Sequence, residues 1–314
     1  FMLFGMALIY AQTGTLAFSS LLDTRLVISD TYTIAAVSLI SAGIAFKLSL
    51  APFHIWTPDV YEGSPIPSTT YLATIGKAAM FVVLLRFVEI SDALTFKSVV
   101  AVFSIIAVIS IMVGNLLALM QDNLKRILAY SSIAHMGYLL IAVIASFFAV
   151  GTVSIEAVTF YLLAYVIMSL GAFGVLSIFS SSQNELDSIA DYQGLFWRSP
   201  WLAAVFTGML LSLAGIPLTV GFIGKFYVFL AGVETELWIL LSVLIVGSGI
   251  GLYYYLRIVY RMLMPVSGDN ILVDTRMENL STLGVLAILF VLLLALGIYP
   301  APIMAIIEAI SVHI

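Results

Sequence analysis

The sequence contains no cysteine and very few charged residues. None of its 314 residues is Cys, which excludes disulfides, thiolate-held iron–sulfur clusters, Cys-ligated zinc sites and cysteine nucleophiles. Only 9% of the residues are charged, against about 25% in an average globular domain. With 62% hydrophobic residues, the chain lacks the polar surface that a water-soluble protein needs. The sequence therefore predicts a protein that lies mostly in lipid.

Basic residues and histidines are scarce as well. The chain has 12 Lys and Arg against 17 Asp and Glu, a net charge of −5, so no dense basic surface is available for nucleic-acid phosphates. His54 and His135 are isolated, and His313 lies in the tail, a pattern that speaks against haem ligation. We therefore expect no nucleic-acid partner, and no metal or cofactor held by this chain.

Long apolar runs predict transmembrane helices. The runs are continuous and do not alternate, which favours helices over a β-barrel, and the expected fold class is an all-α polytopic membrane protein. The first run, of about 11 residues from Phe1 to Ala11, is only roughly 16 Å long as a helix. We therefore expect an N-terminally truncated piece of a longer membrane protein. The predicted spans are 1–14, 32–57, 67–88, 98–120, 126–149, 155–179, 201–231, 237–260 and 280–298.

The basic residues in the loops predict the orientation. They divide into Arg25, Arg86 and Lys97 on one side and Lys125, Arg126, Arg198, Arg257, Arg261 and Arg276 on the other. Because cytoplasmic loops are enriched in Lys and Arg, the second side is predicted to be cytoplasmic and the C-terminus to lie outside. For the pair Lys125-Arg126, topology is the preferred explanation, since cations at a helix start oppose the helix dipole.

Three shorter segments have simpler expectations. The polar stretch 180–199 is predicted to be an exposed loop or short surface helix. Residues 303–313 are predicted to lie along the membrane interface. Tyr253-Tyr254-Tyr255 is interpreted as an interfacial aromatic belt, with a proton-path role for one hydroxyl as the alternative.

Two of the predicted spans contain helix-breaking residues. Span 32–57 carries Pro52 and is followed by Pro58, and span 201–231 contains Pro217 among three glycines. The two predicted breaks are five spans apart, so the second crosses the membrane in the opposite direction, as an inverted repeat requires. The alternative is that Pro and Gly are simply more frequent in membrane helices.

Lys47, Lys77 and Lys225 lie inside predicted spans and are the candidate catalytic residues, with a role in proton transfer. Each costs on the order of 2.5–3.5 kcal/mol at mid-membrane, which favours a function. A buried lysine balanced between desolvation and a nearby charge can load and release a proton. The alternative, a structural ion pair, needs buried carboxylates, and Asp and Glu here lie in loops or at span edges.

Three further polar residues are candidates for supporting roles. His54 and His135 titrate near neutrality and can extend a proton path, although a membrane histidine is as often a hydrogen-bonded packing group. Asp59 is a candidate proton entry, with N-capping or turn formation after Pro58 as the alternative.

These residues also carry a family resemblance. The run 46–63 (FKLSLAPFHIWTPDVYEG), the pair Gly76-Lys77 and the run 215–226 (GIPLTVGFIGKF) resemble the N subunit family of bacterial NADH:quinone oxidoreductase (complex I), subunit 2 in mitochondria. The related L and M subunits and Mrp-type antiporter subunits share the architecture but lack the FHIWTPDVYEG wording. The family's key lysines match Lys47, Lys77 and Lys225, and in the family the first pairs with a Glu on an earlier helix.

The resemblance implies antiporter-like inverted five-helix repeats, each with one discontinuous helix, in a fourteen-helix subunit. On this chain they would be 1–95, an incomplete first repeat, and 96–262, a second repeat, followed by a C-terminal span and tail, 263–314. About five spans and the Glu would precede Phe1. The resemblance further implies a bacterial inner-membrane protein with M-type, K-type and neighbouring complex I subunits and lipid as partners. NADH, FMN, iron–sulfur clusters and quinone would be bound by other subunits, and no G-x-G-x-x-G fingerprint occurs here.

The function expected from lysines and resemblance together is proton translocation driven by remote redox chemistry. Two alternatives stay open. One is a free-standing cation/proton antiporter coupled to sodium, although sodium sites need oxygen ligands that are scarce at depth in this sequence. The other is a structural spacer of the membrane arm.

Overall fold

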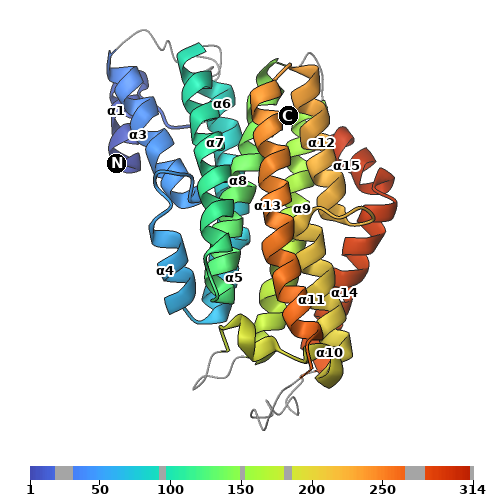
Figure 1. The fold of residues 1–314 in the computed structure, drawn as a ribbon. Coiled ribbons are helices and arrows are strands. Elements are labelled where there is room, and N and C mark those ends of the chain that lie inside the picture. Colours follow the sequence, from blue (N-terminus) through green and yellow to red (C-terminus); the bar gives the residue numbers. More distant parts are fainter. Residues whose placement is uncertain (18–30, 92–96, 149–152, 180–185, 266–279, 312–314) are drawn as a thin grey trace.

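The computed structural model describes residues 1–17, 31–91, 97–148, 153–179, 186–265 and 280–311, and these ranges contain helices and no β-strand (Figure 1). The expected all-α class is confirmed. The helices are α1 Met2–Thr13, α3 Thr31–Leu48, α4 Trp56–Gly63, α5 Ile66–Ala73, α6 Ile75–Ser91, α7 Lys97–Leu119, α8 Leu124–Phe148, α9 Val153–Phe179, the 3-10 helix η2 Ile189–Tyr192, α10 Leu195–Arg198, α11 Pro200–Ala214, α12 Val220–Glu234, α13 Trp238–Leu263, α14 Leu280–Ile298 and α15 Ala301–Ser311.

Seven helical stretches among the described residues are long and apolar enough to cross a membrane. They agree with the predicted spans, and α14 has the bounds predicted for the last one. The predicted spans 1–14 and 201–231 correspond to shorter apolar helices, α1 in the first case and α11 with α12 in the second.

Helix α8 is the centre of the bundle. It is buried over nearly its whole apolar length, with 94% of its span inside the protein, whereas the outer span of α14 is only 17% buried. Helices α4, α7, α9, α12 and α13 pack around it. The polar side chains in the middle of α8, Ser131, Ser132 and His135, are therefore buried, and this helix positions the candidate site.

Both predicted helix interruptions are present. The first lies between α3 and α4, where residues 49–55 form turns, and the second lies between α11 and α12. In Figure 1, α3 stands above α4, whereas α11 stands below α12, so that the chain passes through the two interrupted helices in opposite directions. The inverted-repeat boundaries themselves remain a prediction.

A third interruption was not predicted. The expected span 67–88 is split into α5 and α6 at Thr74, whose dihedral angles (φ −112°, ψ −87°) are not helical. The sequence does not predict this break, because the apolar run continues through Thr74 without a proline. The break lies one turn before Lys77 and leaves the end of α5 facing α9.

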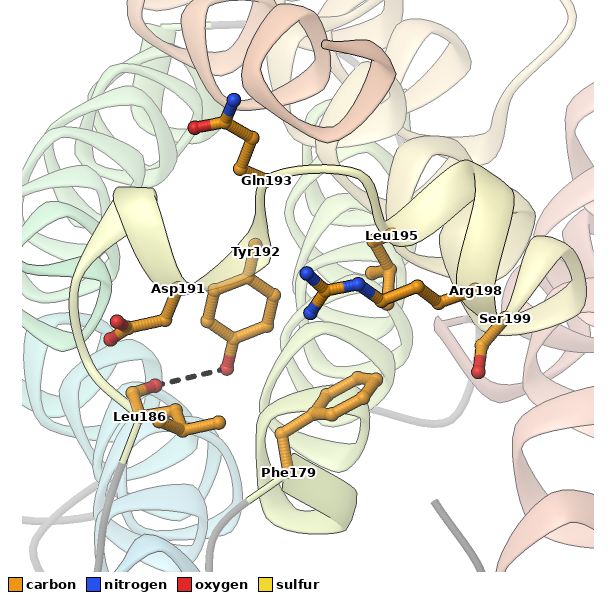
Figure 2. Close-up of a pocket in the computed structure, with 8 residues that line it drawn as sticks. All are labelled: Phe179, Leu186, Asp191, Tyr192, Gln193, Leu195, Arg198 and Ser199. Carbon is orange, nitrogen blue, oxygen red and sulfur yellow. Dashed lines mark hydrogen bonds between the residues drawn. The ribbon is translucent and has the colours of Figure 1, made fainter. Parts of the chain in front are cut away.

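The segment 186–199 is more buried than predicted. The segment forms the short helices η2 and α10, as the short-helix alternative predicted. Ile189, Tyr192 and Leu195 are nevertheless buried, with 5%, 3% and 5% of their surface exposed, so the expectation of an exposed loop is wrong for these residues. Figure 2 shows Tyr192 and Phe179 among the residues that line a small cavity, where the Tyr192 hydroxyl donates to the Leu186 carbonyl at 3.1 Å. The segment is held because its backbone pairs with the α7–α8 turn. The Leu124 amide donates to the Asp187 backbone carbonyl at 2.6 Å, and the Ile189 amide donates to the Asp122 carbonyl at 3.0 Å.

Lys125, Arg126 and Arg257, which were predicted to lie on the same side, lie together at the α7–α8 turn, at one end of the bundle. Arg257 of α13 donates to the carbonyls of Leu119 and Gln121 in the α7–α8 turn, next to Lys125 and Arg126. Arg25, Arg276 and His313 lie outside the described residues. Which end faces the cytoplasm remains a prediction.

Candidate functional site

Two of the three candidate lysines are buried in the bundle. Lys77 is 1% exposed and Lys225 is 8% exposed. Lys47, in contrast, lies on the surface of the described chain, so the prediction that it is buried is wrong for this chain taken alone. Lys47 lies in the last turn of α3, where its side chain is exposed while the neighbouring Leu48 is fully buried.

Lys77 projects from α6 toward the central helix. Its ammonium donates to the Ser132 hydroxyl of α8. The Tyr165 hydroxyl of α9 lies 3.0 Å from the same serine oxygen and 2.9 Å from the carbonyl of Ala73, the last residue of α5. The Tyr61 ring of α4 completes the pocket, with its centre 5.8 Å from the ammonium. A hydroxyl and a π face are therefore the partners of this lysine.

Lys225 is held by the second helix interruption. Its ammonium donates to the carbonyls of Leu213 and Ala214, at 3.0 and 2.9 Å, which are the last two residues of α11. The final carbonyls of a helix have no intrahelical donor and carry the negative end of its dipole, so they favour a cation. The break that the glycines and proline predicted thus builds the binding site of the lysine.

Two glycines make this interruption possible. Gly215 ends α11 with a φ of +91°, and a Cβ there would lie 3.0 Å from Cδ of Lys225. Gly221, the second residue of α12, lies so close to α11 that a Cβ would overlap the Ser212 carbonyl. The amide of Gly221 donates to the Ser212 hydroxyl at 3.0 Å, which satisfies one of the free amides at the start of α12.

His135 of α8 lies between the two lysine sites. Its Nδ1 is 2.7 Å from the Tyr161 hydroxyl, and the donor is set by the histidine tautomer. The imidazole contacts the rings of Tyr165 and Tyr138, with centres 5.5 and 5.6 Å away. The Tyr138 ring centre in turn is 5.2 Å from the Lys225 ammonium. These contacts define a polar row: Lys77, Ser132, Tyr165, Tyr161, His135, Tyr138 and Lys225.

A side branch leaves the polar row at Tyr138. Its hydroxyl accepts from the Asn115 amide of α7 at 3.0 Å, and Asn115 accepts from the Tyr254 hydroxyl of α13 at 3.2 Å. Tyr254 and Tyr255 are each 1% exposed, while Tyr253 is 65% exposed. The aromatic-belt interpretation is therefore wrong for Tyr254 and Tyr255, because their side of α13 packs against α7 and α8.

His54 and Asp59 are not part of the polar row. His54 is half-buried in the first interruption. Asp59 lies in the first turn of α4, where its carboxylate pairs with Arg126 at 2.9 Å. Of the three supporting residues predicted, the structure places only His135 between the buried lysines.

The first interruption has its backbone groups satisfied by protein. The Phe46 carbonyl accepts from the Ser49 amide and from the Trp56 indole, each at 3.0 Å. The Ala51 amide donates to the Ser110 hydroxyl of α7 at 2.9 Å. Non-helical backbone at membrane depth needs such partners.

Ser132, Tyr138, Tyr161 and Tyr165 belong to the site and were not predicted from the sequence. Ser132 and Tyr138 lie three residues before and three residues after the predicted His135 on α8, and Tyr161 and Tyr165 are four apart on α9. These spacings place side chains on one helix face, and they are the sequence signal that identifies the four residues. Over the residues that the structure covers, no group of three or more His, Asp or Glu is arranged to hold a metal ion.

Curated relatives match nearly the whole chain, and a sequence family matches its first 251 residues. The family described as "NADH:quinone oxidoreductase/Mrp antiporter, TM" matches residues 1–251. NADH-quinone oxidoreductase subunit N of Methylococcus capsulatus is 49% identical over 304 residues, 96% of this chain and 61% of that protein. The subunit of the same name from Acinetobacter baumannii is 50% identical over 307 residues, again 96% and 61%. The chain thus spans about three fifths of the length of these relatives.

Solved structures show the same architecture. A chain of respiratory complex I from Thermus thermophilus with bound aureothin superimposes with a TM-score of 0.79 at 35% identity, covering 97% of this chain and 64% of that one. A chain of the Mrp complex from Dietzia sp. gives a TM-score of 0.86 at 20% identity, covering 99% and 64%, which is a likeness in fold alone. The chain belongs to the NADH:quinone oxidoreductase/Mrp antiporter transmembrane family.

Proposed function

We propose that the chain forms part of a proton-translocating membrane subunit of NADH:quinone oxidoreductase and moves protons between Lys77 and Lys225. The observation that carries this proposal is the kind of partner the lysines have. Within the described residues neither lysine forms an ion pair, and both are held by hydroxyl, carbonyl and π groups. Since no fixed negative charge locks them in the charged form, both protonation states are available to them.

The polar row supplies the intermediate positions. The Ser132 and Tyr165 hydroxyls accept a proton from one neighbour while they donate their own to the next, and His135 does the same between its two ring nitrogens. The hydrogen bonds form two segments, Lys77–Ser132–Tyr165 and His135–Tyr161, joined by ring contacts. In the proposal, transfer between segments uses side-chain rotation and water that enters the polar row.

The remaining predicted residues lie where protons would enter or leave the polar row. Lys47, on the surface beside the first interruption, delivers or accepts protons at one end of the polar row, with His54 and Asp59 in supporting roles. The redox chemistry takes place in other subunits, and neighbouring M-type and K-type membrane subunits transmit it by changing the charge state of the lysines. The basic end of the bundle faces the bacterial cytoplasm, the C-terminus lies outside, and 1–95 and 96–262 are the two repeats.

The test uses the full-length subunit in the assembled enzyme, in inside-out membrane vesicles. Lys225→Ala should lower proton uptake per NADH oxidised by at least fivefold, while Lys97→Ala, an exposed lysine at the start of α7, should leave the ratio unchanged. The proton gradient should form equally with and without sodium and collapse with a protonophore. A gradient that requires sodium would rule out the proposal. Wild-type pumping by the double variant Lys77→Ala/Lys225→Ala would also rule it out.

A further inference from the structure

The short helix α4 carries one wall of the Lys77 site. Its Tyr61 ring is fully buried, with 0% of its surface exposed, and lies over the Lys77 ammonium and edge-on against Phe173 of α9. Helix α4 has only eight residues, between the first interruption and Ser64-Pro65. A helix of two turns has little stability of its own, so its position depends on contacts with its neighbours.

Arg126 forms ion pairs with two carboxylates of α4. Its guanidinium NH1 lies 2.9 Å from Asp59 Oδ1 and 2.5 Å from Glu62 Oε2. Asn123, whose Oδ1 accepts from the Arg126 amide at 3.1 Å, donates to the other Glu62 oxygen at 3.3 Å. Charge-assisted bonds of this kind fix geometry as well as contribute energy. The start of α8 therefore holds the residue that follows Tyr61.

Lys125 binds backbone carbonyls at the C-terminal end of α4. Its side chain is completely buried, and its ammonium lies 3.3 Å from the Glu62 carbonyl and 3.2 Å from the Ser64 carbonyl, with Asp187 Oδ1 at 3.7 Å. These carbonyls lie at the C-terminal end of α4, where a cation is favoured. Lys125 therefore closes α4 in the same way that Lys225 closes α11.

Helix α8, which carries Lys125 and Arg126, also carries Ser132, the hydrogen-bond partner of Lys77. Ser132 follows Lys125 by seven residues, two helical turns or roughly 10 Å along α8. Helix α8 thus binds α4 at its start and the Lys77 ammonium two turns later. Any displacement of α4 from the start of α8 moves Tyr61 away from Lys77.

We infer that Lys125 and Arg126 are positioning residues for the Lys77 site, holding α4 so that the Tyr61 ring covers the lysine. The inference rests on the proposed function, and it adds to the topological role that the sequence predicted for this pair. Neither residue touches Lys77, so their effect on proton transfer passes through Tyr61.

The decisive test is a double-mutant comparison in the assembled full-length enzyme. Arg126→Gln and Tyr61→Leu should each lower protons pumped per NADH by at least threefold with wild-type amounts of complex. The double variant should be no worse than Tyr61→Leu, because both changes remove the same contact. Arg261, in the last turn of α13, is exposed and serves as the control. Arg261→Gln should not change the protons pumped per NADH, either in the wild type or in Tyr61→Leu.

Conservative variants protect the test against simple misfolding. Lys125→Arg keeps donors for the two carbonyls and should pump like the wild type, whereas Lys125→Met should lose pumping. If Arg126→Gln does not assemble, Arg126→Glu combined with Glu62→Arg replaces it, and restored assembly with restored pumping supports the inference. Restored assembly with pumping still lost contradicts it.

Two other results would overturn the inference. The first is a double variant whose loss is the product of the two single losses. The second is an Arg126→Gln enzyme with normal protons per NADH. Either result, with Lys77→Ala still defective, leaves the proposed function intact, whereas normal pumping by Lys77→Ala rejects the proposed function itself.

Discussion

The ammonium of Lys225 lies 5.2 Å from the centre of the Tyr138 ring, and the same ring stands nearly perpendicular to the His135 imidazole, at 86°, with the ring centres 5.6 Å apart. Tyr138 therefore connects the lysine at the second helix interruption with the centre of the polar row. The ring and the hydroxyl have different neighbours, because the hydroxyl is bonded to Asn115 of the side branch. Mutation separates the two contributions.

Tyr138→Phe keeps the π face and should lower proton pumping less than threefold. Tyr138→Leu removes it, and a buried cation–π contact is worth about 1–2 kcal/mol, so pumping should fall roughly tenfold. The ratio of protons to NADH in membrane vesicles measures both. Equal losses in the two variants would assign the role to the hydroxyl and the Asn115 branch.

Ser132→Ala should disable the Lys77 end of the polar row. It leaves a buried ammonium without its hydroxyl acceptor, and hydrogen bonds to charged groups contribute about 1.5–3 kcal/mol, so at least a tenfold loss of pumping is expected. Ser146→Ala is the matched control on the same helix, since that hydroxyl only returns to the Val143 carbonyl. A Ser132→Ala enzyme that pumps like Ser146→Ala would remove Ser132 from the path.

Gly221→Ala should destabilise the packing of α12 against α11 at the second interruption. The new Cβ would overlap the Ser212 carbonyl, and overpacking of this kind costs typically 1–3 kcal/mol or more. Gly284→Ala on α14, with no atom within 4 Å of the new Cβ, should be neutral or stabilising by about 0.5–1 kcal/mol. Thermal unfolding of the purified enzyme in detergent measures both, and equal stability of the two variants would contradict the close packing of α11 and α12.

Tyr192 should make stability depend on alkaline pH. Burial, together with Asp187 and Asp191, raises the pKa of its phenol well above the ordinary value, so the folded protein keeps the neutral form. Its contribution is complete below the unfolded pKa of about 10 and is lost as the pH rises above it, because only the unfolded chain then ionises. The free energy of unfolding, measured from pH 8 to 11, should fall less steeply in Tyr192→Phe. An unchanged slope would place Tyr192 in water.

The helices were predictable because lipid imposes a length on apolar runs. Span 98–120 was placed within one residue of α7, and the break before Lys225 followed from Gly215 and Pro217. What the sequence did not show is which side of each helix meets a neighbour. Each of these helices carries apolar residues on all of its faces. The sequence pattern therefore does not distinguish the buried Tyr254 from the exposed Tyr253.

The same limit applies to the candidate site. Lys77 and Lys225 were singled out by the cost of a charge at membrane depth, and both are buried. Lys47 was singled out in the same way and lies on the surface of the described chain. Ser132 and Tyr61 carry no such cost, because hydroxyls are common in membrane helices. Only the packing of α4, α6 and α8 shows that they belong to the Lys77 site.

The central claim is that protons pass through Lys77. Its most direct test is the number of protons taken up per NADH oxidised by inside-out vesicles that contain the full-length Lys77→Ala enzyme at wild-type assembly. We expect a ratio at least fivefold below that of the wild type, with Lys97→Ala unchanged. A wild-type ratio in Lys77→Ala would show that protons do not pass through Lys77.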